Sequence, residues 1–167
     1  GIFAGGDAVR REAAATVSKL GAKEFGPALA ALVKDGKNPA GVRVEALLAL
    51  DAMKDASVKE LAATALAGDE PKLRAAGRAV MARLDPAAVL KELPALLKDD
   101  KTSMAEKQGA FEILARFKES QPADYLIDNW LGDLIAGKVP AALALDILDA
   151  AETRANTPKL KLYAPLK

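Results

Sequence analysis

The chain of 167 residues contains no cysteine and no histidine, and these two absences exclude several kinds of chemistry. Without cysteine there can be no disulfide, no thiolate metal site and no cysteine nucleophile. Without histidine the chain lacks the commonest general base and the commonest transition-metal ligand. We therefore expect no catalytic residues, no metal site, no cofactor and no small-molecule substrate.

Aromatic residues are scarce, at 4% of the chain, and long apolar runs are missing. A membrane-spanning helix needs about 18 or more apolar residues in succession, so we expect no membrane insertion. Neither sign of charge is in excess, because 24 Lys and Arg face 23 Asp and Glu. A dedicated nucleic-acid-binding protein usually carries a strong basic excess, so we expect no nucleic-acid partner.

The chain does contain a repeated sequence motif in an Ala- and Leu-rich background. The basic residue of this motif is Arg10, Arg43, Arg74 and Lys107 in successive repeats, at spacings of 33, 31 and 33 residues. Such a period, with two amphipathic segments in each repeat, is typical of a stacked helical array. The basic residues themselves are interpreted as a capping or interhelical salt-bridge ladder, with Asp7, Glu45 and Glu70 as local partners, rather than as an anion-binding stripe.

Apolar periodicity and helix punctuation together predict ten helices, which pair into five hairpins. Gly21 is expected to end the first helix, and Asp85 and Ser103 stand where helices should begin. The predicted ranges, uncertain by about 2–4 residues at each end, are 7–20, 23–35, 40–54, 56–67, 71–84, 86–98, 103–118, 122–136, 140–154 and 158–165.

The first two repeats carry the pattern most clearly. They read Asp7-x-Val-Arg10-x-x-Ala13-Ala14-x-x-Val17-x-x-Leu20-Gly21, and then Phe25-x-Pro27-Ala28-Leu29-x-x-Leu32-Val33-Lys34-Asp35. This pattern resembles the short bacterial form of the HEAT repeat. The resemblance weakens after Val139, and the pattern changes at Ala76 and Lys107. It implies an all-α, right-handed solenoid of about five HEAT-like hairpins, with the second helices on the concave side.

A second resemblance concerns the setting of the domain. Residues 1–167 are expected to form a single HEAT-repeat domain excised from a larger chain, with Gly1–Ala4 as its edge. HEAT arrays that end in a stretch like Tyr163-Ala-Pro-Leu-Lys167 are similar to the middle segment of large bacterial membrane-associated dehydrogenases. In those proteins a sorbosone-dehydrogenase-like propeller precedes the array and a cytochrome c domain follows it. The resemblance implies a periplasmic or extracytoplasmic location.

The sequence therefore predicts a non-catalytic scaffold or spacer, whose partners are another protein or neighbouring domains of the same chain. Solenoids bind along an extended concave face, so the predicted contact residues lie on the second helices: Lys59, Lys91, Tyr125, Asp128 and Asn129. The alternative is a HEAT-like enzyme, such as an alkyl-base DNA glycosylase or a bilin lyase. A glycosylase needs a basic, aromatic-lined groove and a catalytic carboxylate, and the low aromatic content argues against it.

Two features are interpreted as structural rather than functional. Asp124, Asp128 and Asp133 fall on one predicted helix. A rigid helix rarely supplies the 6–8 oxygen ligands of Ca²⁺, so these carboxylates are expected to form a solvated acidic face. Trp130, the only tryptophan, is expected in the core or at its edge rather than as a platform for a ligand.

Overall fold

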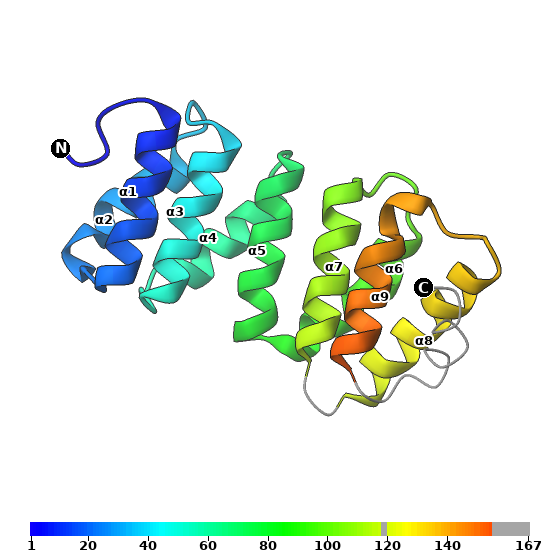
Figure 1. The fold of residues 1–167 in the computed structure, drawn as a ribbon. Helices are drawn as coiled ribbons and strands as arrows, with labels where there is room; N and C mark the ends of the chain where they lie inside the picture. The colour runs from blue at the N-terminus through cyan, green and yellow to red at the C-terminus, as the bar shows by residue number, and fades with distance from the viewer. Residues whose placement is uncertain (118–119, 155–167) are drawn as a thin grey trace. The chain divides into compact units, whose positions relative to one another are not determined.

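A computed structural model describes residues 1–117 and 120–154, and all the regular secondary structure of these residues is helical (Figure 1). This confirms the predicted all-α class. Contacts between residues divide the chain into two compact units, Gly1–Leu84 and Asp85–Lys167, and each is described by itself. The predicted helix at 158–165 lies outside the described residues.

The first unit consists of five α-helices and one 3-10 turn in two layers. Helices α1, α3 and α5 lie side by side, while α2 packs on α3 and α4 packs on α5 (Figure 1). The bounds are α1 Asp7–Leu20, a 3-10 turn Lys23–Phe25, α2 Gly26–Lys34, α3 Ala40–Ala52, α4 Val58–Ala67 and α5 Pro71–Leu84.

The largest departure from the predicted bounds in this unit is at α2. The predicted helix 23–35 begins as a 3-10 turn, and the α-helix starts only at Gly26. Pro27, with its fixed φ and no amide hydrogen, fits the first turn of a helix, where the amide has no partner within the helix. The helix therefore starts where the proline can be accommodated.

Gly21 ends α1 as predicted. Its φ of 63° is left-handed, and its amide donates to the carbonyl of Ser18. Glycine adopts this conformation without the steric penalty that a Cβ brings. Lys54, 33 residues later, has a φ of 55° at the end of α3, so the two helices end with the same backbone conformation.

The core of the first unit lies between its two layers. Leu29, Leu47, Leu50 and Leu61 are almost completely buried there. Helices α4 and α5 approach so closely at Gly77 that a Cβ atom on this glycine would lie 2.8 Å from the carbonyl oxygen of Ala62.

The repeated arginines do not all have the predicted partners. Arg43 Nε donates to the carbonyl of Val33, in the last turn of α2, at 2.9 Å, and Arg74 Nη1 donates to the carbonyl of Gly68 at 3.0 Å. These bonds satisfy carbonyl oxygens that the end of a helix leaves without an amide donor.

Arg10 also binds a carbonyl that precedes its own helix. Its Nε donates to Gly5 at 3.0 Å and its Nη1 donates to Oδ1 of Asn38 at 2.8 Å. The predicted local partners, Asp7 for Arg10 and Glu45 for Arg43, are therefore wrong, whereas the bonds of Arg43 and Arg74 to carbonyls at helix ends fit the predicted capping role. The guanidinium groups of Arg10 and Arg43 bond to carbonyl oxygens because the turn before each helix brings unsatisfied acceptors within their reach. The pairing of Arg74 with Glu70 stays a prediction.

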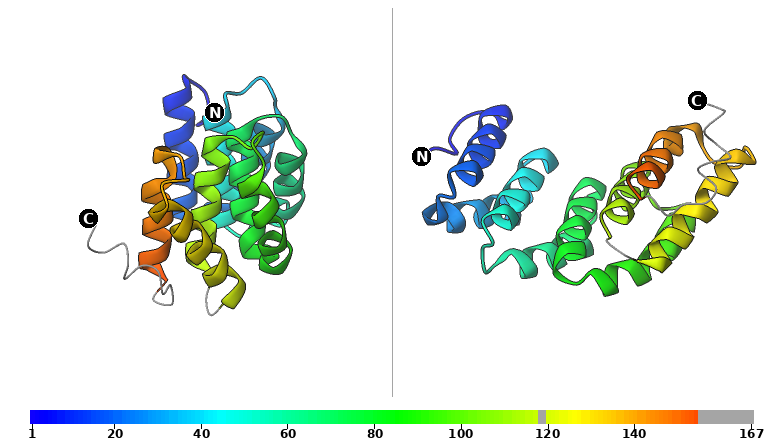
Figure 2. Two further views of the ribbon diagram at one scale, coloured as in Figure 1. Left: turned by 90° about the vertical axis from the view of Figure 1, so that its right-hand side faces the viewer. Right: turned by 60° about the horizontal axis from the view of Figure 1, so that its bottom comes forward.

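The second unit has four described α-helices. Helix α9 packs on α7 and α8, and α6 packs on both α7 and α8 (Figure 2). The bounds are α6 Pro86–Lys98, α7 Met104–Arg116, α8 Gln121–Ile135, a 3-10 turn Ala141–Leu143 and α9 Ala144–Thr153.

The two predicted helix caps of this unit, Asp85 and Ser103, are confirmed. The Asp85 side chain accepts from the amide of Ala88 at 3.2 Å. Ser103 and Glu106 form a reciprocal capping box at the start of α7, which satisfies amides that the first turn leaves free. Phe111 of α7 and Trp130 of α8 meet edge to face, with ring centroids 5.7 Å apart. Trp130 is half-buried, which confirms its predicted place at the edge of the core.

Arg154 closes the second unit just after α9. Its side chain is buried and pairs with Asp124 of α8. The same guanidinium donates to the carbonyls of Leu114 and Ser120, each at 3.1 Å, and to that of Phe117. One arginine thus joins the end of α7, the start of α8 and the end of α9.

Candidate functional site

The five predicted contact residues lie on second helices, as their spacing indicated, but they do not form one cluster. Lys59 is exposed on α4 of the first unit, and Lys91 is exposed on α6 of the second. Tyr125, Asp128 and Asn129 lie on α8. Their role in binding a partner stays a prediction.

Tyr125 and Asn129 line a groove between α6 and α8. The groove has a volume of about 920 Å³. Pro94 and Lys98 contribute its α6 wall, while Leu126 and Trp130 are among the apolar residues that α8 supplies. Asp128 and Lys91 are not among the lining residues, so the structure brings together only two of the five predicted residues.

The α8 wall follows from helical geometry. Pro122, Tyr125, Asn129, Asp133 and Ala136 recur at intervals of three or four residues, so they share one face of the helix. Tyr125 is 71% exposed, which is unusual for so large an aromatic side chain. A tyrosine offers a large apolar ring with a hydroxyl at its tip, and this combination is enriched where proteins bind one another.

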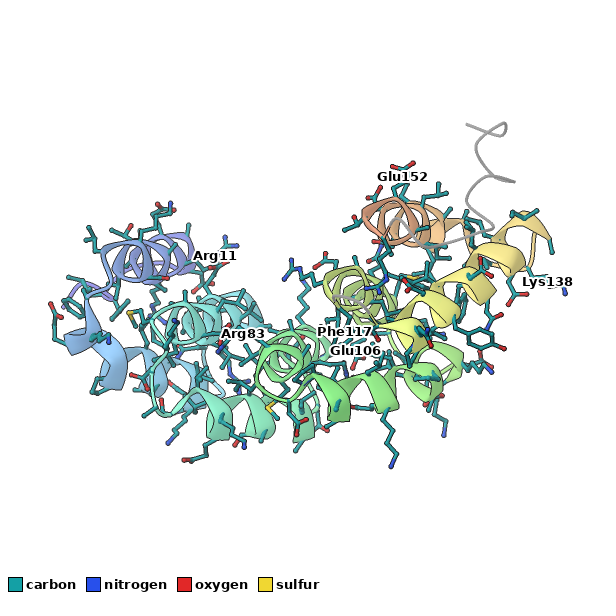
Figure 3. The ribbon with its side chains drawn as sticks, turned by 90° about the horizontal axis from the view of Figure 1, so that it is seen from below. Arg11, Arg83, Glu106, Phe117, Lys138 and Glu152 are labelled. Atoms are coloured by element: carbon teal, nitrogen blue, oxygen red, sulfur yellow. The ribbon has the colours of Figure 1, made fainter. Side chains whose placement is uncertain are left out.

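Both charged and apolar groups border the groove. Lys98 ends α6, and Lys138 follows the end of α8 and projects from the body of the unit (Figure 3). Asp133 lies on the same wall as Tyr125. Pro94 has no amide hydrogen, so the carbonyl of Leu90 does not receive the usual helical bond from residue 94. The groove thus offers two aromatic rings, two cations and a carboxylate in one place.

The predicted acidic face of α8 is not uniform. Asp124 pairs with the buried Arg154, whereas Asp133 borders the groove. Within residues 1–117 and 120–154, no three carboxylates come close enough together to hold a metal ion. No described helix is long and apolar enough to cross a membrane.

Sequence reasoning found Tyr125 and Asn129 but missed the opposite wall. Pro94 and Lys98 precede Tyr125 by roughly 30 residues, and local periodicity does not show which faces of two helices meet. The one signal in the sequence for this wall is Pro94, a proline inside α6.

Comparison with known proteins yields no match to a family model, a curated protein or a solved structure.

Proposed function

We propose that this protein is a non-catalytic scaffold that binds a protein segment in the groove between α6 and α8. The observation that carries this proposal is the exposed ring of Tyr125 beside the half-buried Trp130, in a groove of about 920 Å³. Contact residues at protein interfaces are enriched in Tyr and Trp, because these side chains bury a large area and still form hydrogen bonds.

The proposed partner is another protein or a neighbouring domain of the same polypeptide. A photoreactive amino acid at Tyr125 can test this in the intact polypeptide. We expect one discrete cross-link, either to another chain or within the same chain. Trp130→Ala should abolish it, because this substitution removes an apolar wall of the groove. The same probe at Leu145, which is 72% exposed on α9, should give no cross-link.

The result that contradicts the proposal is equally specific. If the probes at Tyr125 and Leu145 give the same products, the groove has no selectivity. If the probe at Tyr125 gives none while the protein is in its natural complex, the groove is not a contact site.

We also propose that the chain is a HEAT-like right-handed solenoid within a larger bacterial membrane-associated dehydrogenase, placed outside the cytoplasm. The spacing of Arg10, Arg43 and Arg74 and the two-layer packing of the first unit support the solenoid. The dehydrogenase context rests only on the resemblance of Tyr163–Lys167. A reading frame that encodes a Cys-x-x-Cys-His motif soon after Lys167 would support it, and one that ends without such a motif would argue against it.

One observation keeps the glycosylase alternative open. The groove combines two aromatic rings with a carboxylate, Asp133, and two lysines, Lys98 and Lys138. These are the groups that binding of an alkylated base would require. Affinity for an alkylated DNA duplex would fall steeply between 50 and 200 mM salt if phosphate contacts carried the binding. We expect fluorescence anisotropy to detect no binding at either concentration.

A further inference from the structure

One face of α1 is apolar and uncovered by any described residue. Val9 is 54% exposed and Leu20 is 76% exposed. Together with Ile2, Ala13, Thr16 and Phe25, these two residues line a hollow of about 760 Å³. Residues 9, 13, 16 and 20 recur at intervals of four, three and four, so they form a single stripe along α1.

The equivalent stripe of α3 is buried, and that of α5 is buried except at its last residue. The spacing of the repeated arginines places Val42 and Leu73 at the position of Val9, and these two residues are 0% and 2% exposed. Met53 at the end of α3, at the position of Leu20, is only 6% exposed, whereas Leu84 of α5, at the same position, is 36% exposed. The apolar stripe is therefore covered along the whole of α3 and over most of α5, and in α1 it is open.

The structure also shows what covers the stripe in the other two helices. Helix α3 packs on α1 and α2, and α5 packs on α3 and α4, so each stripe meets the helical hairpin before it (Figure 1). At Gly77, the position of Ala13, a Cβ atom would lie 3.1 Å from Cβ of Ala65 on α4. The second helix of the preceding hairpin supplies small residues at this contact.

From this we infer that the open stripe of α1 is a docking surface for a helical hairpin of a partner protein, one that packs on α1 as α3 and α4 pack on α5. The partner's second helix would carry Leu and Ala at intervals of three or four residues, as Leu61, Ala62 and Ala65 do in α4. Among the residues that line the hollow, Glu12 alone is charged, so a Lys or Arg at the edge of that helix would complement it.

A fusion protein provides the test. In this fusion a second copy of residues 40–70, which contain α3, α4 and the connector to α5, is joined to Gly1 of the full chain, so that the added hairpin can dock on α1. The link gives the added hairpin a high effective concentration at the stripe. We expect the melting temperature of the first unit to rise by about 4 °C or more. Hydrogen exchange of the α1 amides should slow by about tenfold or more.

Two variants separate docking from a general effect of the fusion. Leu61→Glu in the added copy alone should abolish the gain, because that residue belongs to the helix face that α4 buries. Leu20→Lys in the stripe should also abolish it. In the unfused chain, Leu20→Lys should leave the melting temperature within about 1 °C, since Leu20 is 76% exposed and substitutions of exposed side chains usually have little effect on stability.

Three outcomes would overturn the inference. The fusion could leave both the melting temperature and the exchange rates unchanged. The gain could survive Leu20→Lys, in which case the added hairpin binds elsewhere. Sedimentation could instead show that the unfused chain dimerises and that Leu20→Lys returns it to a monomer, which would make the stripe a contact between two copies of this chain.

Discussion

Gly77 shows how a single missing side chain sets the distance between two helices. A Cβ atom at this position would lie 2.8 Å from the carbonyl oxygen of Ala62 and 3.3 Å from the amide nitrogen of Leu66. Both atoms belong to the backbone of α4, which cannot move aside as a flexible side chain can. The close contact between α4 and α5 therefore depends on glycine.

We expect Gly77→Ala to lower the free energy of unfolding by up to about 2 kcal/mol. Alanine favours a helix over glycine by about 1 kcal/mol, but overpacking typically costs about 1–3 kcal/mol. Gly41→Ala is the matched control, because its Cβ atom would meet only the flexible side chain of Arg11, at an ordinary distance of 3.5 Å from Cδ and 3.8 Å from Nη1. Urea unfolding of both variants measures the change in the free energy of unfolding. A Gly77→Ala protein more stable than the parent would show that α4 and α5 can move apart at little cost.

Asp55 gives the first unit a pH-dependent contact. Its Oδ1 accepts from the hydroxyl of Ser57 at 2.6 Å and from the amide of Ser57 at 2.9 Å. The hydroxyl bond, and then the amide bond, lower the pKa of Asp55 below its ordinary 3.8, while slight burial opposes them. A lowered pKa in the folded state means that the charged carboxylate stabilises the fold.

This contribution should be present in full above pH ~4 and be lost as the pH falls through the lowered pKa. We expect Asp55→Asn to be less stable than the parent at pH 7, with the difference shrinking towards pH 2. Urea unfolding at several pH values measures this. Ser57→Ala should raise the pKa of Asp55 in an NMR titration. A pKa that does not change in Ser57→Ala would show that the serine is not the cause.

The structural role of a single residue was predictable where that role depends only on the local backbone. Gly21 was identified as a helix end and Asp85 as a cap from their positions beside apolar periodic segments. The partners of Arg10 and Arg43 were mistaken because sequence shows nearby carboxylates but not free carbonyls. A long side chain such as arginine can donate to a backbone carbonyl in the preceding turn, whatever residue carries that carbonyl.

At the scale of helices, Arg154 is the main connection in the second unit. It is 7% exposed and reaches Asp124, whose side chain is 16% exposed, as well as three backbone carbonyls from residues 114–120. Removing this guanidinium would leave the Asp124 carboxylate without its cation in a partly desolvated place, although the carbonyls of Leu114 and Ser120 would keep the amides of Phe117 and Asp124 as donors. Such an unpaired group is costly.

We expect Arg154→Met to lower the free energy of unfolding of the second unit by about 3 kcal/mol, within the usual range for breaking a buried ion pair. The control is Arg83→Met. Arg83 pairs with Asp51 across α5 and α3, but its side chain is 47% exposed (Figure 3). The control should lose less than about 1 kcal/mol. Equal losses in the two variants would mean that burial of Arg154 adds nothing.

Helices were the most predictable level of structure. Nine of the ten predicted helices have counterparts in residues 1–117 and 120–154. The errors lie at ends such as 23–25 and 141–143, where a 3-10 turn replaces the first α-helical turn. Amphipathic periodicity continues through such a turn, so it does not distinguish the two geometries. The groove was less predictable, because it depends on which faces of α6 and α8 meet.

At the scale of the whole molecule, the division after Leu84 was not visible in the sequence. A single residue, Asp85, separates α5 from α6, and an Asp-Pro pair there reads as an ordinary helix cap. Nothing in composition or spacing distinguishes this junction from the other turns. The division reflects where contacts between helices are concentrated, and those contacts depend on side chains from distant parts of the chain.

The two units should therefore lose stability separately. Leu47 in α3 and Ile127 in α8 are both fully buried. Truncating either to alanine should cost about 2–5 kcal/mol in lost burial and cavity formation. We expect Leu47→Ala to speed hydrogen exchange in residues 7–84 and to leave residues 86–153 nearly unchanged, with the reverse for Ile127→Ala. Contacts concentrated within each unit make it a separate cooperative block. Faster exchange across both units in either variant would show that the chain unfolds as a single block.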